Sequence, residues 1–422
     1  MIIQEIERIL VDIPFYEVPE RNTARYLAGW HISEVCRVTT DAGIVGYGET
    51  LPNYTWGRVT DVAVERVRGK NPFACMWDDS LGAGLQMALF DVAGKAAGVP
   101  AYRLLGEKTR DWCPLSWWSI DMPPEDMAAE AKRAVEMGYT AHKQKARPWF
   151  DCVEQARQTA AVIPPTFALD FDFNGHLLNA ASAVPVLKVL DTFPNVLIYE
   201  SPIPQDDVAG NRRVREQTRC AIAMHYGSPP VMTAIREGVC DGFVVGGGAS
   251  AVMRQQAVAK TANMPFWLQL VGTGLTTTFA MHQGAVCTHA QWPAVTCLNM
   301  YQHQLITEPI QVKGGYVRVP EEPGLGITVD EEALKRYRVE SSIKENLRAV
   351  YAIERANGDR TYFAGEMRTG SGVPIGYWED SFAGNLPPYE QGARLVTLAD
   401  DGSSEWRDLH TRVQQAPVRS HK

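Results

Sequence analysis

Two lysines that alternate at the end of a short segment are the residues best suited to chemistry in this chain. Lys143 and Lys145 are separated by one residue and follow Gly138 closely. Side chains two apart on a strand point to the same side, so the two ammonium groups share one face. Neighbouring ammonium groups repel, and the more buried one releases its proton more easily. The pair therefore contains a candidate general base, although two solvated surface lysines would give the same pattern.

Carboxylates close the next two apolar segments. Asp172 ends residues 167–172, and Glu200 ends residues 196–200. At the ends of successive parallel strands, two carboxylates point into one mouth, where their repulsion requires a cation. Each acid could instead cap a following helix, but Glu200 precedes a proline-rich loop rather than a helix start. We therefore favour a divalent cation bound beside a lysine base.

The elements that must position these groups alternate between short strands and helices along the chain. A helix is predicted over 124–138, with Pro124 and two acidic residues at its start and Gly138 as its stop. Eight short apolar strands alternate with helix-like segments, which predicts a parallel (β/α) barrel with its chemistry at the C-terminal strand ends. The strands are expected at 115–118, 141–145, 167–172, 196–200, 221–225, 242–245, 266–269 and 294–298.

Three regions are expected along the chain. Residues 1–111 predict an α+β capping domain with a strand at 2–10, a hairpin at 35–49 and helices at 59–67 and 85–97. Residues 112–320 form the barrel. Residues 321–422 return to the capping domain and add a tail. From about Gly370 the tail carries several aromatic residues, so we expect it to pack on the barrel or on a neighbouring subunit.

Composition excludes several classes of protein. The 422 residues carry a formal charge of −8 and show no basic stripe, which argues against nucleic acid or an anionic membrane as partner. The start of the chain does not resemble a signal peptide, and no apolar run is long enough to cross a bilayer. The eight cysteines are scattered without a C-x-x-C pair. They indicate buried thiols in a reducing compartment, and a cytoplasmic location is expected.

The order of the motifs resembles a known family. K-x-K at 143–145, D-x-N-G at 172–175 and Y-E-S-P at 199–202 resemble the enolase superfamily, in its mandelate racemase and muconate-lactonising branch. The segments G-Y-G-E at 46–49, A-L-F-D-V-A-G-K at 88–95 and P-G-L-G at 323–326 also match that pattern. The resemblance implies removal of a proton α to a carboxylate, with the resulting enediolate held by Mg²⁺ or Mn²⁺. Lys145 would be the base, and Lys143 would tune it and help to hold the substrate carboxylate.

Four strand ends depart from that family. His225 ends the fifth strand, where the family has an acid that would complete the metal site with Asp172 and Glu200. The sixth strand runs into glycines 246–248 and offers no acid or lysine. Gln269 replaces the histidine base of the racemase branch, and Asn299 stands where that branch has a glutamate. His225 could be a metal ligand, a general acid, or a pocket histidine in a site without metal.

These departures favour a reaction with a single base. Racemisation needs a base on each face of the carbanion, so we expect a lyase, a dehydratase acting on a hydroxy acid or sugar acid. The alternatives are an epimerase or cycloisomerase, or a non-catalytic protein that binds a carboxylate. A homo-oligomer and a small carboxylate substrate are expected as partners. The residues expected to contact substrate are Asn174, Gln269, Asn299, Tyr54, Trp56 and Arg25.

Overall fold

A computed structural model of the chain describes residues 1–54, 57–345, 347–364 and 376–420. The chain divides into two compact units, each of which is assembled from three separate segments. The first contains Met1–Tyr16, Gly29–Trp118 and Gly242–Lys344, and the second contains Glu17–Ala28, Ser119–Asp241 and Glu345–Lys422. The boundaries expected at residues 111 and 320 stay a prediction. None of the described helices has the length and apolar character needed to cross a membrane.

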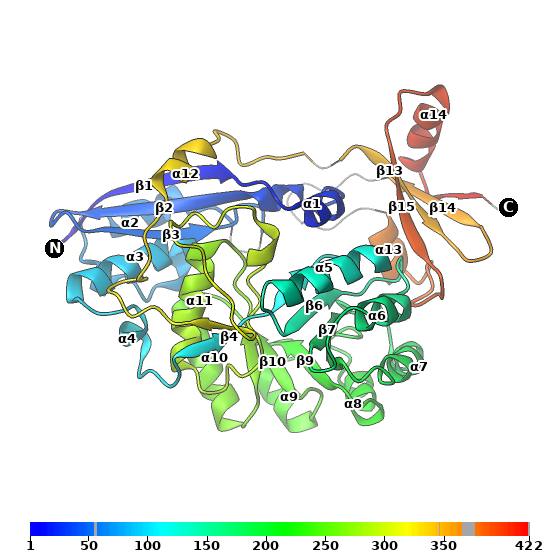
Figure 1. The fold of residues 1–422 in the computed structure, drawn as a ribbon, viewed down its shortest axis with the longest axis horizontal. Coiled ribbons are helices and arrows are strands. Elements are labelled where there is room, and N and C mark those ends of the chain that lie inside the picture. Colours follow the sequence, from blue (N-terminus) through cyan, green and yellow to red (C-terminus); the bar gives the residue numbers. More distant parts are fainter. Residues whose placement is uncertain (55–56, 346, 365–375, 421–422) are drawn as a thin grey trace. The chain divides into compact units, whose positions relative to one another are not determined.

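The first unit begins with the antiparallel sheet that the sequence predicts. β1 (Ile3–Asp12) pairs with β2 (Ile32–Thr40), which pairs with β3 (Val45–Thr50). Helix α3 (Ala83–Ala97) packs on this sheet, and Figure 1 shows it along β2 and β3. Gly48 of β3 allows this close approach, because a Cβ there would lie 2.2 Å from the carbonyl oxygen of Gly84. The other helices of this segment are α2 (Asp61–Val67) and α4 (Tyr102–Leu105), with short 3-10 turns at Ala28–His31, Pro72–Ala74 and Asp79–Leu81.

The same unit carries a parallel pair of barrel strands. β10 (Gly242–Val245) pairs with β11 (Phe266–Leu268), and these strands precede helices α10 (Ala249–Thr261) and α11 (Gly274–Val286). β4 (Trp112–Pro114) pairs with β12 (Tyr316–Arg318), and α12 (Glu331–Arg336) follows. The eighth predicted strand, 294–298, is reduced to two parallel bridges, which join Ala294 to Leu115 and Val295 to Gln269. Cys297 has φ of 59°, which interrupts extended backbone, and a 3-10 turn at Leu298–Met300 follows.

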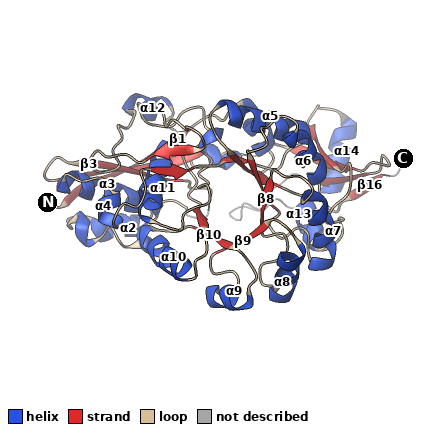
Figure 2. Ribbon diagram, turned by 60° about the horizontal axis from the view of Figure 1, so that its bottom comes forward, coloured by secondary structure: helices blue, strands red, loops and turns tan. Residues whose placement is uncertain are grey.

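The second unit contains four parallel strands with alternating helices. The order along the chain is α5 (Pro124–Glu136), β6 (Ala141–Lys145), α6 (Cys152–Ala160), β7 (Ala168–Asp172), α7 (Ala180–Leu190), β8 (Val196–Glu200), α8 (Val208–Gln217), β9 (Ala221–His225) and α9 (Val231–Glu237). In Figure 2, α7, α8 and α9 lie outside the strands β8 and β9. Asp151 starts α6, since its carboxylate accepts from the backbone N–H groups of Val153 and Glu154.

The remaining segments of the second unit are α1 and the C-terminal residues. α1 covers Glu17–Thr23. The strands β13 (Ala349–Glu354), β14 (Arg360–Ala364), β15 (Arg394–Ala399) and β16 (Val418–Ser420) form an antiparallel sheet in the order β15-β13-β14-β16. Helices α13 (Tyr377–Phe382) and α14 (Ser404–Val413) belong to the same region, which is orange to red in Figure 1.

The fold class predicted from the sequence is confirmed. The barrel strands form one sheet in the order β11-β10-β9-β8-β7-β6-β5, where β5 is Trp117–Ser119. This is a parallel sheet of the (β/α)-barrel type, and the antiparallel sheet β1–β3 is its capping element. Seven strands are present in the described part of the sheet, rather than the eight expected.

Candidate active site

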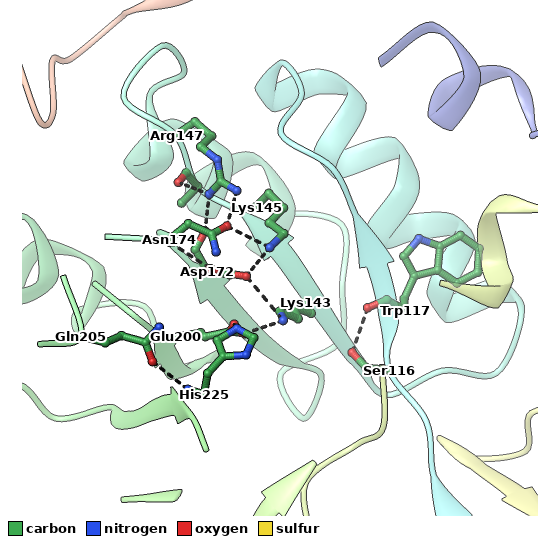
Figure 3. A network of polar contacts seen from close by, with 11 residues as sticks. Ser116, Trp117, Lys143, Lys145, Arg147, Asp172, Asn174, Glu200, Gln205 and His225 are labelled. Atoms are coloured by element: carbon green, nitrogen blue, oxygen red, sulfur yellow. Dashed lines mark hydrogen bonds and ion pairs between the residues drawn. The ribbon is translucent and has the colours of Figure 1, made fainter. Parts of the chain in front are cut away.

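Charged side chains form a row across neighbouring strands of the second unit. Lys145 pairs in register with Asp172, and Asp172 pairs with Glu200. Glu200 lies opposite Ala223 of β9, and His225 is two residues further along, on the same face. Figure 3 shows the side chains of this row pointing toward one another. The parallel register therefore brings together the strand-end residues that the sequence singled out.

The backbone turns sharply after each carboxylate of this row. Asn174 has φ of 45° and Ser201 has φ of 44°, a left-handed conformation that residues other than glycine rarely adopt. The backbone N–H of Asn174 donates to Oδ1 of Asp172 at 3.0 Å, which fixes the orientation of that carboxylate. Such conformations persist where the surroundings over-determine them, which is common in active sites.

Lys143 joins the two carboxylates. Its side chain is 1% exposed, and Nζ lies 3.4 Å from Oδ2 of Asp172 and in an ion pair with Oε2 of Glu200. Burial disfavours ionised Asp172, but Lys145, Lys143 and Arg147 outweigh it and hold the pKa of Asp172 below its usual range. Both carboxylates are fully buried, so each requires such a partner to stay charged.

Lys145 has the environment of a general base. Its amine donates to Oδ1 of Asn174 at 3.0 Å and to Oδ2 of Asp172, and its side chain is 15% exposed. Burial lowers the pKa of Lys145 from its ordinary value, Lys143 and Arg147 add to this effect, and Asp172 opposes it. A partly accessible amine with a lowered pKa gives up its proton more readily than an ordinary lysine, so Lys145 is the candidate general base.

His225 is the most accessible member of the row. Its side chain is 40% exposed, and Nε2 lies 3.0 Å from Oε1 of Glu200. Its backbone N–H donates to Oε1 of Gln205 at 2.8 Å, which anchors the end of β9. Burial and Asp172 raise the pKa of Glu200, but Lys143 and His225 outweigh them and lower it. The imidazole can therefore face a ligand while it remains attached to an ionised carboxylate.

Arg147 belongs to the site and was missed in the sequence. Its guanidinium is 3% exposed, and it donates to the carbonyl oxygen of Asp172 at 2.9 Å and to Oδ1 of Asn174. The signal was present, because Lys143, Lys145 and Arg147 continue one alternation beyond the end of β6. With it, the cluster holds three basic side chains, Lys143, Lys145 and Arg147, beside the two carboxylates Asp172 and Glu200.

Two of the predicted substrate contacts have other partners. Arg25 is 3% exposed and forms an ion pair with Asp121 at 2.9 Å, and its guanidinium also lies over the ring of Phe150. Asn299 is 7% exposed, and its amide accepts from the N–H of Trp118 and donates to the carbonyl of the same residue. These buried contacts occupy the polar groups of both side chains, and contact of Arg25 and Asn299 with substrate stays a prediction.

The remaining predicted contacts fall in different places. Asn174 lies in the cluster described above. Tyr54 packs edge-on against Trp30, with ring centroids 4.6 Å apart, and Gln269 donates its backbone N–H to the carbonyl oxygen of Val245 at 2.8 Å. Both belong to the first unit, and their contact with substrate stays a prediction. Trp56 lies outside the described residues.

Comparison with known proteins places these strands in a family. The family described as "Enolase C-terminal domain-like" matches residues 126–333, which contain β6 to β11. The structure of a muconate cycloisomerase from Pseudomonas fluorescens matches with a TM-score of 0.66 at 21% identity, over 80% of this chain and 99% of that one. The chain belongs to the enolase superfamily. Its place in the mandelate racemase and muconate-lactonising family, predicted from the K-x-K, D-x-N-G and Y-E-S-P motifs, is confirmed.

Relatives in this superfamily carry out different reactions. A D-gluconate dehydratase from Thermoproteus tenax is 26% identical over 390 residues, covering 81% of this chain and 75% of that protein. An N-succinyl-L-Arg/Lys racemase from Bacillus cereus is 22% identical over 342 residues, covering 73% and 90%. Dehydratases and racemases thus lie at similar distances from this chain, and similarity alone does not choose between them.

In this superfamily member, the carboxylate oxygens of Asp172 and Glu200 are not arranged to bind a divalent cation. Both oxygens of Asp172 contact protein donors, namely the N–H of Asn174 and the lysine amines. Both oxygens of Glu200 lie in ion pairs, with Lys143 and His225, although neither makes a hydrogen bond of regular geometry. Within the described ranges, no three His, Cys, Asp or Glu side chains are grouped so that they could hold a metal ion. Metal binding by Asp172, Glu200 and His225 stays a prediction.

The metal prediction can be tested at position 225. Replacing His225 with Glu should tighten Mg²⁺ binding, because a third carboxylate would add anionic charge at the position of the imidazole. Isothermal titration of Mg²⁺ into wild type and the variant measures the difference, with His225→Gln as the uncharged control. Weaker binding to His225→Glu than to wild type would show that position 225 does not contribute to a cation site.

A third buried acid on these strands gives the fold a pH dependence. Asp170 lies opposite Lys143 in register and is 5% exposed. Burial raises the pKa of Asp170 to about 7, Glu200 adds to this effect, and Lys143 opposes it. Because the folded pKa exceeds the ordinary value of 3.8, the folded state binds more protons between these two values, and stability falls as pH rises through that window.

Replacing Asp170 with Asn should remove that loss of stability. The free energy of unfolding of the variant should fall less than that of wild type between pH 4 and pH 7, by up to about 4 kcal/mol. Urea denaturation across this range measures the effect, and the exposed Asp206, changed to Asn, is the matched control. Parallel stability curves for wild type and Asp170→Asn would contradict the assignment.

Proposed function

We propose that this chain is a dehydratase that removes the α-proton of a hydroxy acid or sugar acid, with Lys145 as the base. The observation that carries the proposal is the position of the Lys145 amine. It ends β6 beside Asp172 and Asn174, keeps partial access to solvent, and has a lowered pKa. Membership of the enolase superfamily supports this chemistry.

The charges of the cluster suit an anionic substrate. With Lys145 neutral, Lys143 and Arg147 balance the carboxylates Asp172 and Glu200. Transfer of the α-proton makes Lys145 cationic, so positive charge appears beside the enediolate as that species gains negative charge. Stabilisation of charge that develops only in the transition state lowers the barrier. No step in this account requires a metal ion.

His225 is assigned the second proton transfer. The α-proton leaves C2 for Lys145, and the hydroxyl on C3 then leaves with a proton from His225. The resulting enol rearranges to a 2-oxo-3-deoxy acid, so the overall change is the loss of one water. The exposure of His225 and its contact with Glu200 support this role, because they place an accessible imidazole in the same row of strand ends as Lys145.

The dehydratase activity can be tested directly. The protein is incubated with D-gluconate, D-galactonate, D-xylonate and arabinonate, and 2-oxo acids are detected as their semicarbazones. Parallel reactions contain Mg²⁺, Mn²⁺ or EDTA. A 2-oxo-3-deoxy product from at least one acid is expected. Epimerised acid without any oxo acid would instead identify an isomerase, and no change in any acid would favour a protein that only binds carboxylates.

A further inference from the structure

The C-terminal segment of the second unit lies beyond the matched family region, which ends at residue 333. This C-terminal module, residues 345–420 as described, consists of the sheet β15-β13-β14-β16 with α13 and α14 (Figure 1). Tyr377, one of the aromatic residues of the tail that was expected to pack on the barrel or on a neighbouring subunit, is 1% exposed and lies in one cluster with Trp149 and Phe150 of the loop after β6.

The module holds the loop that follows the K-x-K strand. The N–H of Gly392 donates to Oδ2 of Asp151 at 2.8 Å, and the hydroxyl of Tyr389 donates to Oδ1 at 3.2 Å. The N–H of Asp151 in turn donates to the carbonyl oxygen of Ala393 at 3.2 Å. The loop also contributes to the core of the module, where Trp149 and Phe150 are buried with Tyr351, Phe363, Tyr377 and Leu395.

Helix α13 contacts Arg147 and His176, which follow the strands β6 and β7. The ring of Trp378 lies over the guanidinium of Arg147, 5.0 Å from its carbon to the ring centroid. Ser381 is three residues after Trp378 on the same helix, and its Oγ is 2.9 Å from Nδ1 of the buried His176. His176 also stacks on Phe382, with ring centroids 4.3 Å apart. The module therefore contacts both the loop after β6 and the loop after β7.

Arg147 connects these contacts to the base. The guanidinium of Arg147, which faces the ring of Trp378, donates to the carbonyl oxygen of Asp172 and to Oδ1 of Asn174. The same Oδ1 accepts from Nζ of Lys145 at 3.0 Å. Figure 3 shows Arg147, Asn174 and Lys145 in this order. Two residues, Arg147 and Asn174, thus separate the tryptophan of the module from the amine of Lys145.

We propose that Trp378 is a positioning residue of the active site, which holds Arg147 against Asn174 and thereby fixes the amine of Lys145. The C-terminal module is then a working part of the site rather than an appended domain. The proposal rests on the assignment of Lys145 as the base. A cation over an aromatic face is favoured in a partly desolvated place, so removal of the ring leaves the guanidinium free to leave Asn174. Small displacements of a catalytic group reduce rate strongly.

The test compares three variants of the full chain. Trp378→Leu removes the aromatic face, and Trp378→Phe retains it. Trp406→Leu is the matched control, because Trp406 is buried in the module among Val350, Ala364 and Val413, in a cluster separate from that of Trp149. At saturating substrate, Trp378→Leu should slow α-proton exchange at least about tenfold while KM changes by less than about threefold. Trp378→Phe should restore most of the rate, and Trp406→Leu should keep the wild-type rate. Wild-type exchange in Trp378→Leu, or an equal loss in Trp406→Leu, would overturn the proposal.

A second measurement does not depend on the reaction. Limited acetylation with acetic anhydride, read by peptide mass spectrometry, reports the accessibility of the Lys145 amine relative to the exposed Lys188. Trp378→Leu should increase acetylation of Lys145 at least about threefold over wild type and Trp378→Phe. If no acid undergoes exchange in wild type but this increase is found, the proposed function fails and the positioning role stands. Unchanged acetylation of Lys145 in Trp378→Leu would refute the positioning role by itself.

Discussion

Replacing Lys145 with Met should abolish both product formation and exchange of the substrate α-proton with solvent. The methionine keeps most of the volume of the side chain and removes only the amine. In the second unit, the amine of Lys145 ends β6 in register with Asp172, where it is partly exposed and has a lowered pKa. Loss of a well-placed general base costs about 10²–10⁴-fold in rate, so turnover should fall by that factor.

The control for this variant is the same change at the exposed Lys188, which should leave the rate unaltered. The midpoint of thermal unfolding should be recorded for both variants, because Lys145 also pairs with the buried Asp172. Lys143 remains within 3.4 Å of that carboxylate and limits the loss of stability. A folded Lys145→Met variant whose turnover falls less than about tenfold would show that another residue is the base.

Replacing His225 with Gln should separate the two halves of the reaction. The amide can still donate a hydrogen bond to Glu200, but it cannot transfer a proton to a leaving hydroxyl. Elimination of water should therefore fall by about 10²–10⁴-fold, while α-proton exchange stays within about tenfold of wild type. Oxo-acid formation and deuterium incorporation, measured on the same samples, give both rates.

The outcome distinguishes the three roles considered for His225. Loss of elimination alone is the result expected of a general acid. Equal loss of exchange and elimination would contradict that role and would place the imidazole in the binding of the substrate carboxylate or of a cation. Retention of both rates would show that His225 is a pocket residue that the chemistry does not use.

The central row of the site could be predicted because it depends only on local rules. Side chains alternate along a strand, and the ends of parallel strands meet at one edge of a sheet, so Lys145, Asp172 and Glu200 had to lie near one another. The bridge that Lys143 makes between the two carboxylates was not predictable. It depends on the path of a long side chain through the interior, which spacing in the sequence does not determine.

Contacts between residues far apart in the chain could not be predicted from the sequence. The guanidinium of Arg25, a predicted substrate contact, forms a buried ion pair with Asp121. The side-chain amide of Asn299 hydrogen-bonds to the backbone of Trp118. The sequence pattern of residues 294–298 is apolar enough for a strand, yet the left-handed Cys297 interrupts it. The pairing of β14 with β16 likewise joins segments far apart in the chain, so the sheet of the C-terminal module could not be inferred from periodicity.

The most direct test of the account is proton NMR of the C2 proton of acid sugars incubated with the wild-type protein in deuterium oxide. The panel of gluconate, galactonate, xylonate and arabinonate should include both C2 epimers of each acid. The account predicts loss of the C2 proton signal for one epimer of at least one acid, and no such loss with Lys145→Met. Equal exchange of both epimers would contradict a single-base mechanism, and exchange that persists in Lys145→Met would contradict the role of Lys145.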